Sequence, residues 1–333
     1  FTPYLEMPDL EDYALEKVYI QADQEDLFQF TDEQLKPLED PKVKAFFLVN
    51  PGNPSSVALD PETISRLVAF VRDKRPDLMI LTDDVYGTFT PHFESIMGHL
   101  PRNTIGVYSY SKYFGCTGWR LGVIAVAREN IFDELIHAHA EDVQQVLEKR
   151  YVALTPTPRD IKFIDRIVAD SRDVALNHTS GLSLPQQVMM MLFGLVEMMD
   201  EEKVYQKACM EICDRRFRAT VEGMGIEVDP REYYCRYYGI IDYEFWLRKY
   251  VGEEVVDWVK ENIHPLDIAF KLAEDHGIVL LNGSGFEAPG WSARVSFANL
   301  DEDAYSAIGR AVRAVARGYV QAFRASRGLP VQP

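Results

Sequence analysis

Residues 104–127 read T-I-G-V-Y-S-Y-S-K-Y-F-G-C-T-G-W-R-L-G-V-I-A-V-A. Residues 104–109 and 120–127 are short, mostly apolar segments rich in β-branched residues, which predicts two strands. The segment between them carries hydroxyl groups, aromatic rings and Lys112. We therefore expect a strand whose carboxyl end presents ionisable side chains.

The preceding sequence repeats this pattern of a strand with a polar end. Residues 42–50 (K-V-K-A-F-F-L-V-N) and 78–82 (L-M-I-L-T) predict two more strands, the second of which closes on Asp83. Between them, Asp60 and Pro61 supply an N-cap and a first-turn proline for a helix. Strands that alternate with helices predict an α/β fold with a mostly parallel sheet, in which ligands bind beyond the carboxyl ends of the strands.

The second half of the chain has longer helical patterns and fewer strands. A long helix that leaves the α/β unit marks a domain boundary, so we expect a large domain over residues 1–199 and a smaller α+β domain over residues 200–333. The expected elements are helical segments over 131–150, a buried helix over 186–200, an amphipathic helix over 201–223, a strand over 237–246, a helix over Asp267–His276 before Gly277, short strands over 278–281 and 294–297, and a final helix from Asp301 past Phe323.

Composition narrows the range of partners. The chain has 333 residues, and 35 Lys and Arg against 52 Asp and Glu give a net charge of -17. Sequence-independent binding to nucleic acid or anionic lipid needs clustered Lys and Arg, so we expect neither as a partner. The longest apolar stretch, residues 188–196, is well short of the roughly 20 residues that span a membrane. The start, F-T-P-Y, lacks an initiator methionine and a signal peptide, so we expect that the chain was processed or that a segment precedes it.

Four cysteines in a chain of this length predict a reducing cytoplasmic location and no disulfide scaffold. Cys209 and Cys213 are four residues apart and would share one face of a helix, a spacing that could hold a metal. No second pair or nearby histidine completes such a site. We interpret both as small buried apolar groups and expect no metal.

Lys112 is the centre of the functional interpretation. A lysine in a partly desolvated pocket can lose its proton near neutral pH and attack a carbonyl carbon, forming a Schiff base. Ser109 and Arg120 offer a hydroxyl and a permanent charge suited to a phosphate. Two alternatives stand beside this interpretation: an ordinary surface lysine, or the S-x-x-K motif of penicillin-binding hydrolases formed by Ser109 and Lys112. The S-D-N and K-T-G partners of that motif do not occur in the chain.

Four motifs in order resemble the fold-type I pyridoxal-phosphate enzymes of the aspartate aminotransferase superfamily. Residues 50–54 (N-P-G-N-P) are similar to the family's N-P-x-N-P turn, and residues 83–86 (D-D-V-Y) to its D-x-x-Y segment. Residues 109–112 (S-Y-S-K), with Arg120 eight positions after the lysine, resemble its Schiff-base segment. Arg294 falls where the family keeps an arginine. The resemblance implies a three-layer αβα large domain and a smaller α+β C-terminal domain.

The resemblance also implies roles for individual residues. Lys112 would carry the cofactor pyridoxal 5'-phosphate, Asp83 would pair with its ring nitrogen, and Asn53 and Tyr86 would bind its phenolic oxygen. Ser109, Ser111 and Arg120 would hold the phosphate, while Arg294, together with Asn53, would bind the substrate, with Arg294 on its α-carboxylate. Taken singly, Asp83 could instead cap a turn, Arg294 could form a surface ion pair, and Tyr86 and Asn53 could simply pack and cap.

Within the superfamily, the same segments resemble the aspartate 4-decarboxylase branch, whose bacterial enzymes convert L-aspartate to L-alanine and CO2 with aspartate transamination as a side activity. Residues 144–178 and 232–265 look like that branch's insertions. The resemblance implies L-aspartate and 2-oxo acids as substrates. Arg150 and Arg159 are candidates for contacting the β-carboxylate. The alternatives are an ordinary aminotransferase and a non-catalytic, aminotransferase-like binding module.

The family's glycine-rich phosphate loop and its ring-stacking aromatic have no match in this chain. We expect them before residue 1, because residues 1–10 resemble the entry into a helix inside the large domain. The resemblance further implies a homodimer or a higher homo-oligomer in which each site is completed across a subunit interface.

Overall fold

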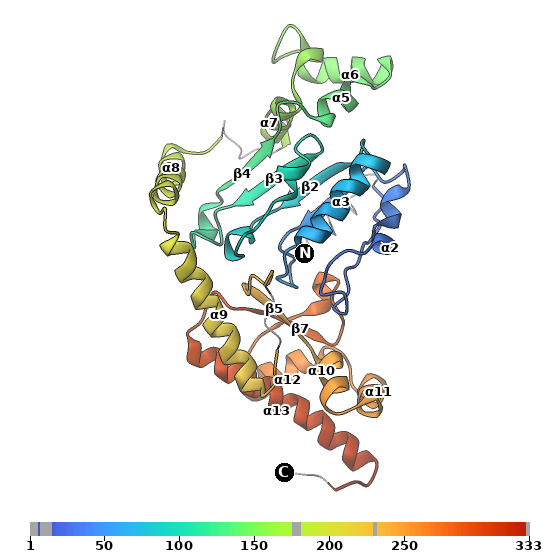
Figure 1. The fold of residues 1–333 in the computed structure, drawn as a ribbon, viewed down its shortest axis with the longest axis vertical. Coiled ribbons are helices and arrows are strands. Elements are labelled where there is room, and N and C mark those ends of the chain that lie inside the picture. Colours follow the sequence, from blue (N-terminus) through green and yellow to red (C-terminus); the bar gives the residue numbers. More distant parts are fainter. Residues whose placement is uncertain (1–5, 7–14, 175–180, 229–231, 331–333) are drawn as a thin grey trace.

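The computed structural model describes residues 6, 15–174, 181–228 and 232–330. The prediction for residues 1–10 therefore falls outside the described residues, Glu6 apart. The described chain forms a four-stranded sheet and a three-stranded sheet, each with its own helices (Figure 1). The four-stranded sheet lies within residues 45–126 and the three-stranded sheet within residues 238–296. A domain boundary near residue 200 stays a prediction.

The larger sheet has the strand order β1-β2-β3-β4. The first three strands are parallel and β4 runs antiparallel to β3, so the predicted α/β fold with a mostly parallel sheet is confirmed. Register places Val49, Asp83 and Val107 side by side, which brings three strand ends to one edge. The strands are β1 (Ala45–Val49), β2 (Met79–Asp83), β3 (Thr104–Ser109) and β4 (Gly122–Val126).

One face of this sheet packs against α3 (Pro61–Lys74). The helix begins as predicted, because the side chain of Asp60 accepts a hydrogen bond from the backbone N–H of Thr63 and Pro61 occupies the first turn. The buried cluster on this face includes Phe46, Leu48, Ile64, Leu67, Val71 and Ile80. The other face is less covered: Phe47 is 43% exposed, while Ile105 and its neighbours pack on α5 (Ile131–His137) and on Phe163.

Short helices and turns complete this part of the chain. They are α2 (Asp32–Leu35), α4 (Ile96–His99), α6 (Glu141–Tyr151), α7 (Phe163–Val174), and the single 3-10 turns η2 (Lys36–Glu39), η3 (Gly87–Phe89), η4 (Thr117–Trp119) and η5 (Pro158–Asp160). The predicted helical stretch over 131–150 is thus divided between α5 and α6, because Asn130 caps the first helix and a break at 138–140 separates the second.

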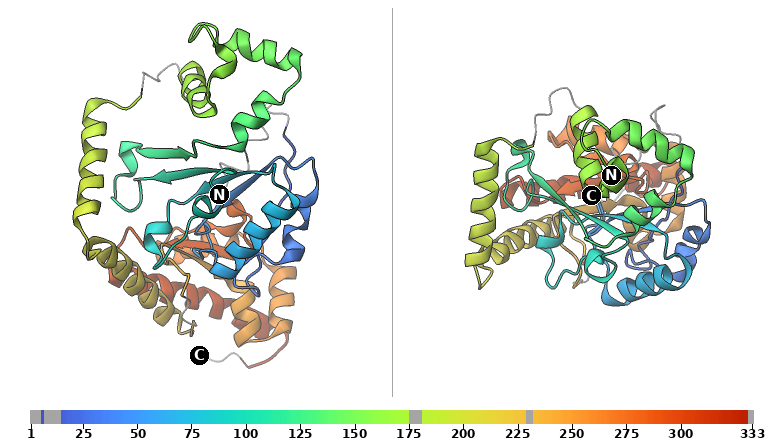
Figure 2. Two further views of the ribbon diagram at one scale, coloured as in Figure 1. Left: turned by 45° about the horizontal axis from the view of Figure 1, so that its top comes forward. Right: turned by 90° about the horizontal axis from the view of Figure 1, so that it is seen from above.

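The prediction of a buried helix over 186–200 is wrong in one respect. The helix is present as α8 (Leu184–Met199), but none of its residues is buried. Met191 is 63% exposed and Met198 is 81% exposed. An apolar sequence all round a helix predicts burial, yet the described residues cover α8 on one side only, where Phe193 stacks on Phe114 with ring centroids 4.5 Å apart. Figure 2 shows α8 at one side of the molecule.

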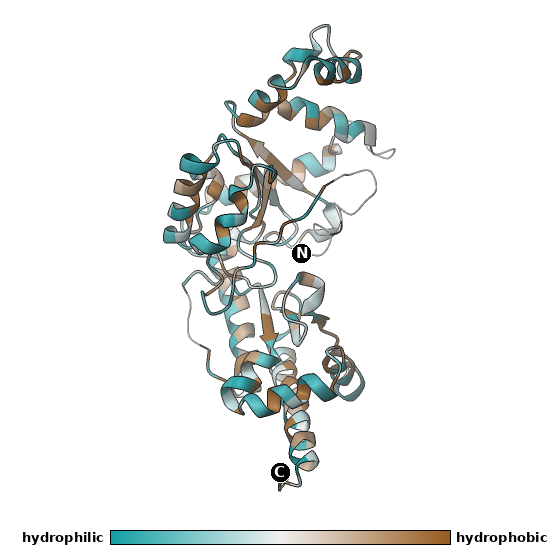
Figure 3. Ribbon diagram, turned by 90° about the vertical axis from the view of Figure 1, so that its right-hand side faces the viewer, coloured by the Kyte–Doolittle hydropathy of each residue, from teal (hydrophilic) through white to brown (hydrophobic). Residues whose placement is uncertain are grey.

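The smaller sheet has the order β5-β7-β6 and is antiparallel. Its strands are β5 (Tyr238–Asp242), β6 (Leu281–Asn282) and β7 (Ser292–Ser296), and its helices are α9 (Val204–Met224), α10 (Tyr243–Tyr250), α11 (Glu253–Asn262), α12 (Asp267–His276) and α13 (Glu302–Ser326), with the 3-10 turn η6 (Gly283–Phe286). The long helices α9 and α13 and the helix that ends before Gly277 confirm their predictions. Figure 3 shows hydrophilic and hydrophobic residues mixed along α13, as expected for a helix with one buried face.

Two strand predictions need correction here. The strand expected over 237–246 ends at Asp242, because the Asp242 side chain accepts a hydrogen bond of 3.0 Å from the N–H of Phe245 and so begins α10. The strand expected over 278–281 reaches the sheet only at Leu281. At the end of β5 the helix cap at Asp242 decides where the strand stops, although the apolar sequence continues. At β6 the apolar sequence likewise does not set the strand's bounds.

Helices α9 and α13 cross at two glycines (Figure 1). A Cβ atom on Gly309 would overlap the carbonyl oxygen of Thr220 and lie 2.9 Å from the Cα of Gly223. A Cβ atom on Gly223 would meet the carbonyl oxygen of Ser306 at 2.5 Å. The backbones touch here, so only glycine allows this approach.

Replacing Gly309 by alanine should therefore separate the two helices and destabilise the fold by about 1–3 kcal/mol, the usual cost of overpacking. Gly318 lies on the same helix with nothing within 4 Å of its would-be Cβ. There the same change should stabilise the fold by about 0.5–1 kcal/mol through helix propensity. Urea unfolding followed by circular dichroism measures both variants. Equal effects of the two substitutions would contradict the close approach.

Across the described residues, no helix combines the length and the apolar character needed to cross a membrane.

Candidate active site

The structure places the predicted site residues at strand ends and in the turns that follow. Asn53 lies in the turn after β1, Asp83 ends β2, and Ser109 ends β3. Tyr86, Ser111 and Lys112 lie in the turns after those strands, and Arg120 precedes β4. Arg294 comes from the other sheet, in the middle of β7. Hydrogen bonds and ring contacts connect most of these residues, as follows.

Arg294 lies against the turn that carries Asn53. Its Nη1 donates a hydrogen bond of 3.0 Å to Oδ1 of Asn53. The guanidinium lies between two rings, 4.3 Å from the centroid of Tyr238 and 4.1 Å from that of Phe286. Among the described residues no carboxylate pairs with it, which speaks against the alternative of a surface ion pair. A planar guanidinium held in this way can bind a carboxylate with its remaining donors.

Tyrosines connect Arg294 to Lys112. The hydroxyl of Tyr238 lies 3.4 Å from that of Tyr86, and the ring of Tyr86 is 5.2 Å from the ring of Tyr237. The Nζ of Lys112 lies 5.9 Å from the ring centroid of Tyr237. Burial, with the neighbouring Tyr238, raises the pKa of Tyr86 far above its ordinary value. Tyr86 therefore stays protonated at neutral pH and can donate a hydrogen bond to an anionic oxygen.

The two serines and Arg120 form a polar cluster beside Lys112. The hydroxyls of Ser109 and Ser111 are 2.9 Å apart, and Nη1 of Arg120 donates to Ser111 Oγ at 3.3 Å and to the carbonyl of Thr117 at 3.1 Å. No carboxylate pairs with Arg120 in the described part of the chain. Hydroxyl donors beside an unpaired guanidinium suit a phosphate group.

The structure distinguishes Asp83 from its neighbour Asp84. Asp83 follows Leu81 in the alternation of β2 and so lies on the less covered face, beside Val107. Asp84 accepts a hydrogen bond of 2.5 Å from Thr82, and burial raises its pKa above the ordinary value. The contacts of Asp84 therefore indicate a role in the structure of this turn. The Oδ1 of Asp83 also accepts a bond of 3.1 Å from the N–H of Val85, so the turn-capping alternative and a site role are both compatible with its position.

Sequence reasoning missed three residues of this cluster, namely Tyr237, Tyr238 and Phe286. Tyr238 contacts both Arg294 and Tyr86, and Tyr237 is the ring nearest to Lys112. They lie in no recognised motif. The only signal was a pair of tyrosines at the start of a predicted strand, which does not reveal that the strand lies against the turn after β1.

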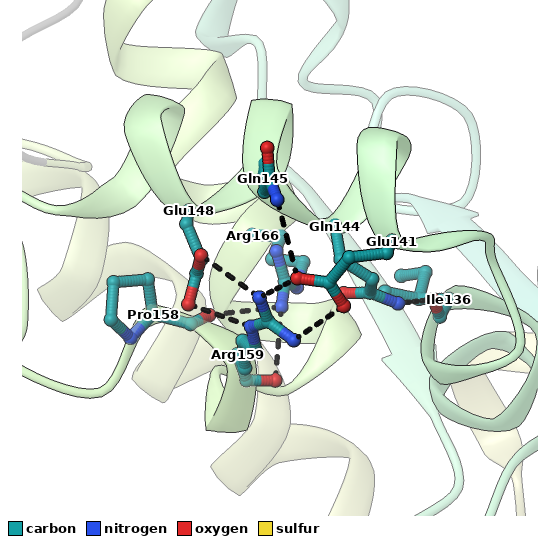
Figure 4. Close-up of polar contacts among 8 residues, drawn as sticks. All are labelled: Ile136, Glu141, Gln144, Gln145, Glu148, Pro158, Arg159 and Arg166. Atoms are coloured by element: carbon teal, nitrogen blue, oxygen red, sulfur yellow. Dashed lines mark hydrogen bonds and ion pairs between the residues drawn. The ribbon is translucent and has the colours of Figure 1, made fainter.

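The two arginines considered for the β-carboxylate have local partners. Arg159 donates from Nε to Glu148 at 2.6 Å and from Nη2 to Glu141 at 2.6 Å, both on α6 (Figure 4). Arg150 donates from Nε to Asp170 at 2.9 Å. Both guanidiniums are therefore engaged outside the cluster around Lys112. The expectation that either contacts a substrate gains no support from these contacts.

The cysteine pair gives no sign of a metal site. Cys213 is buried, and this burial raises the pKa of its thiol to about 12. A thiol that stays protonated at neutral pH is a poor metal ligand. Within the residues that the structure describes, no three His, Cys, Asp or Glu side chains come together in a way that could hold a metal ion.

The fold is that of the aminotransferases. The chain superposes on a tetra mutant of Thermus thermophilus aspartate aminotransferase with a TM-score of 0.61 and 19% identity, over 95% of this chain and 70% of that one. It superposes on Escherichia coli YbdL, which has a methionine aminotransferase function, with a TM-score of 0.61 and 15% identity, over 94% of this chain and 69% of that one. At such identities the likeness concerns the fold alone.

Sequence comparison leads to the family. Residues 7–150 match the family model "Aminotransferase class I and II". A bifunctional aspartate aminotransferase and L-aspartate beta-decarboxylase from a Pseudomonas species is 46% identical over 325 residues, which are 98% of this chain and 61% of that protein. The chain thus spans less than two thirds of that relative's length. Over residues 7–150 the chain is thus similar to the class I and II aminotransferase family. This similarity speaks against the penicillin-binding hydrolase alternative.

Enzymes of this family use pyridoxal phosphate, and the residues present fit it. An arginine and a half-buried lysine, neither of which has an ion-pair partner among the described residues, suit its phosphate and its aldehyde, and two serines lie beside the arginine. A buried, protonated tyrosine suits its phenolic oxygen. This match of donors to groups supports the predicted cofactor.

Borohydride reduction of the protein loaded with pyridoxal phosphate should fix the cofactor on Lys112, because Lys112 is the lysine of this cluster. Peptide mapping by mass spectrometry identifies the labelled peptide. The variant Lys112→Ala should lose the label, whereas Lys74→Ala should keep it, since Lys74 pairs with Glu39 on the far side of α3. A stable label on any other lysine would overturn the assignment of the site.

Proposed function

We propose that this protein catalyses the pyridoxal-phosphate-dependent β-decarboxylation of L-aspartate to L-alanine and CO2, with transamination of aspartate to a 2-oxo acid as a side activity. The observation that carries the proposal is the 46% identity, across 98% of the chain, to a protein named for both activities. The positions of Lys112, Arg294 and Arg120 support it, because such a reaction needs an amine and two anion-binding groups around one pocket.

Seven residues would hold the cofactor, and Arg294 would bind the substrate. Arg120, Ser109 and Ser111 would take the phosphate and Lys112 the aldehyde carbon. Asp83 would face the ring nitrogen, and Tyr86 with Asn53 the phenolic oxygen. When bound, pyridoxal phosphate supplies an electron-withdrawing ring that stabilises negative charge next to the substrate nitrogen.

Arg294 binds and orients the amino acid. Its guanidinium takes the α-carboxylate in bidentate fashion, while the rings of Tyr238 and Phe286 restrict its movement. The hydrogen bond to Asn53 fixes the guanidinium relative to the β1 turn. The substrate Cα is thereby held in a fixed place with respect to Lys112, which is the contribution of orientation to catalysis.

Lys112 moves the proton. Its Nζ, free of any carboxylate partner in the described chain, acts as the general base that takes the proton from the substrate Cα and returns one at the end of the reaction. The ring of Tyr237 lies beside it, with its centroid 5.9 Å from the amine. Tyr86 keeps its own proton throughout, because its pKa is far above neutral.

An assay with L-aspartate as sole substrate separates this proposal from an ordinary aminotransferase. The protein loaded with pyridoxal phosphate should release CO2 and L-alanine without an added 2-oxo acid, with a smaller amount of oxaloacetate. Both products are followed with coupled enzymes. Oxaloacetate without CO2 would establish the aminotransferase alternative, and cofactor binding without any turnover would establish the binding-module alternative.

The neighbouring aspartates provide a matched pair of variants. Asp83→Asn should reduce the turnover of aspartate by about 10²-fold, because a charged group aimed at the reacting system is worth at least this much. Asp84→Asn should keep a turnover of aspartate within a few-fold of that of the parent protein, since Asp84 accepts a hydrogen bond from Thr82 and has no proposed contact with the cofactor. Steady-state rates at saturating aspartate and cofactor measure both. Equal losses in the two variants would contradict the role of Asp83.

We also propose a homodimer or a higher homo-oligomer. The support is the exposed apolar surface of α8, where Met191, Met198 and Met199 are each more than 60% exposed. Analytical ultracentrifugation of the cofactor-loaded protein tests this. A monomer at micromolar concentration would contradict it.

A further inference from the structure

A cavity lies in the C-terminal part of the chain, away from Lys112. Its volume is about 450 Å³, within the range of about 300–1,000 Å³ that is usual for small-molecule sites. It lies between the end of α9, α10 and α13, and one of its walls is Ile241 of β5. The family assignment gives no role to this region.

The cavity and the candidate active site lie on opposite faces of the small sheet. Arg294 pairs with Ile240 across β7 and β5, so these two side chains share one face. The next residue, Ile241, pairs with Ala293 and belongs to the other face, where it joins the core against α13. A ligand in the cavity would therefore not contact the residues around Lys112.

The wall of the cavity is largely apolar and aromatic. Trp246 and Tyr250 of α10 stack with ring centroids 5.8 Å apart and planes at 18°, and both line the cavity. Leu247 of the same helix and Val312 and Val320 of α13 also line it. A wall of this kind binds the apolar body of a ligand, because it removes that body from water.

Three arginines of α13 also line the cavity, namely Arg313, Arg317 and Arg324, and no Asp or Glu lines it. Among the residues that the structure describes, none of the three makes an ion pair or donates a side-chain hydrogen bond. Other arginines nearby have partners: Arg248 of α10 pairs with Glu244 and Glu253, Arg215 of α9 pairs with Glu302, and Arg310 of α13 donates to Ser306. In a chain with a net charge of -17, the three guanidiniums around this apolar space thus keep their donors available.

We propose that this cavity is a binding site for a small organic anion with an aromatic body and one carboxylate. The carboxylate would be bound by the guanidiniums of Arg313 and Arg317, which are four residues apart and so neighbours on the helix surface. The aromatic body would lie against Trp246 and between the aliphatic side chains of α10 and α13. The volume admits a molecule of about two fused rings with a short side chain. The proposal does not depend on the reaction at Lys112.

The probe is indole-3-propionate, titrated by calorimetry into the cofactor-loaded protein. We expect saturable binding of one molecule per chain. Indole-3-propionamide has the same body without the charge and should bind at least tenfold more weakly. Equal affinity of the acid and the amide, or no saturable binding of the acid, would overturn the proposal.

Variants locate the bound probe. Arg313→Gln with Arg317→Gln should weaken binding at least tenfold, whereas Arg310→Gln should not, because Arg310 lies on the same helix, bonds to Ser306 and does not line the cavity. Ala316→Trp places a large side chain in the cavity and should abolish binding of the probe. It provides a second test if the double arginine variant does not fold. Arg294→Gln should leave binding unchanged.

Three further results, from the variants, would also overturn the proposal. The first is loss of binding in Arg294→Gln, which would place the probe at the candidate active site. The second is undiminished binding in Ala316→Trp. The third is a change of oligomeric mass in the arginine double variant without any effect on probe binding, which would make the cavity an interface between copies of the chain.

Discussion

The hydrogen bonds between residues 56–58 and residues 233–238 are the constraint on which the rest of the structure depends. Ser56 is fully buried; its carbonyl accepts from the N–H of Cys235 and its hydroxyl from the N–H of Tyr238, each at 2.8 Å. Ala58 donates to the carbonyl of Tyr233 at 2.8 Å. Buried backbone groups are costly to leave unpaired. These bonds therefore hold the turn after β1 against the start of β5, and with it Asn53 against Arg294.

The paired strands β5 and β7 carry a site residue on one face and core residues on the other. Alternation along β7 directs Arg294 toward Asn53 and Tyr238, while Ala293 and Val295 are buried on the opposite face, where Val295 joins the core with α13. The Gly223 and Gly309 crossing sets the distance from α9 to α13, which also bounds the arginine-lined cavity. The position of Arg294 is consequently determined by backbone contacts far from Lys112 in the sequence.

Much of this arrangement could be predicted from local signals, and the failures have a common cause. Asp60 and Pro61 predicted where α3 starts. The apolar runs before Asp83 and Ser109 predicted that these two residues lie at the ends of strands. Both predictions succeeded because the features depend on nearby residues only. Tyr238 was missed because its contacts with Arg294 and Tyr86 span 56 and 152 positions. The burial of α8 was predicted from its own composition, but burial depends on what other segments cover it.

The acidic character of the chain makes the pairing of its arginines informative. Arg159, Arg150 and Arg248 lie near carboxylates and are neutralised by them, as expected where acidic residues are in excess. Among the described residues, guanidiniums without a carboxylate partner lie beside other kinds of group: Arg120 among hydroxyls, Arg216 at the carbonyl of Phe297, Arg294 near two rings, and Arg313 with Arg317 beside an apolar wall. An unpaired guanidinium keeps its donors for an external anion. Exclusion of acidic neighbours, more than the number of basic residues, thus determines where an acidic protein can bind anions.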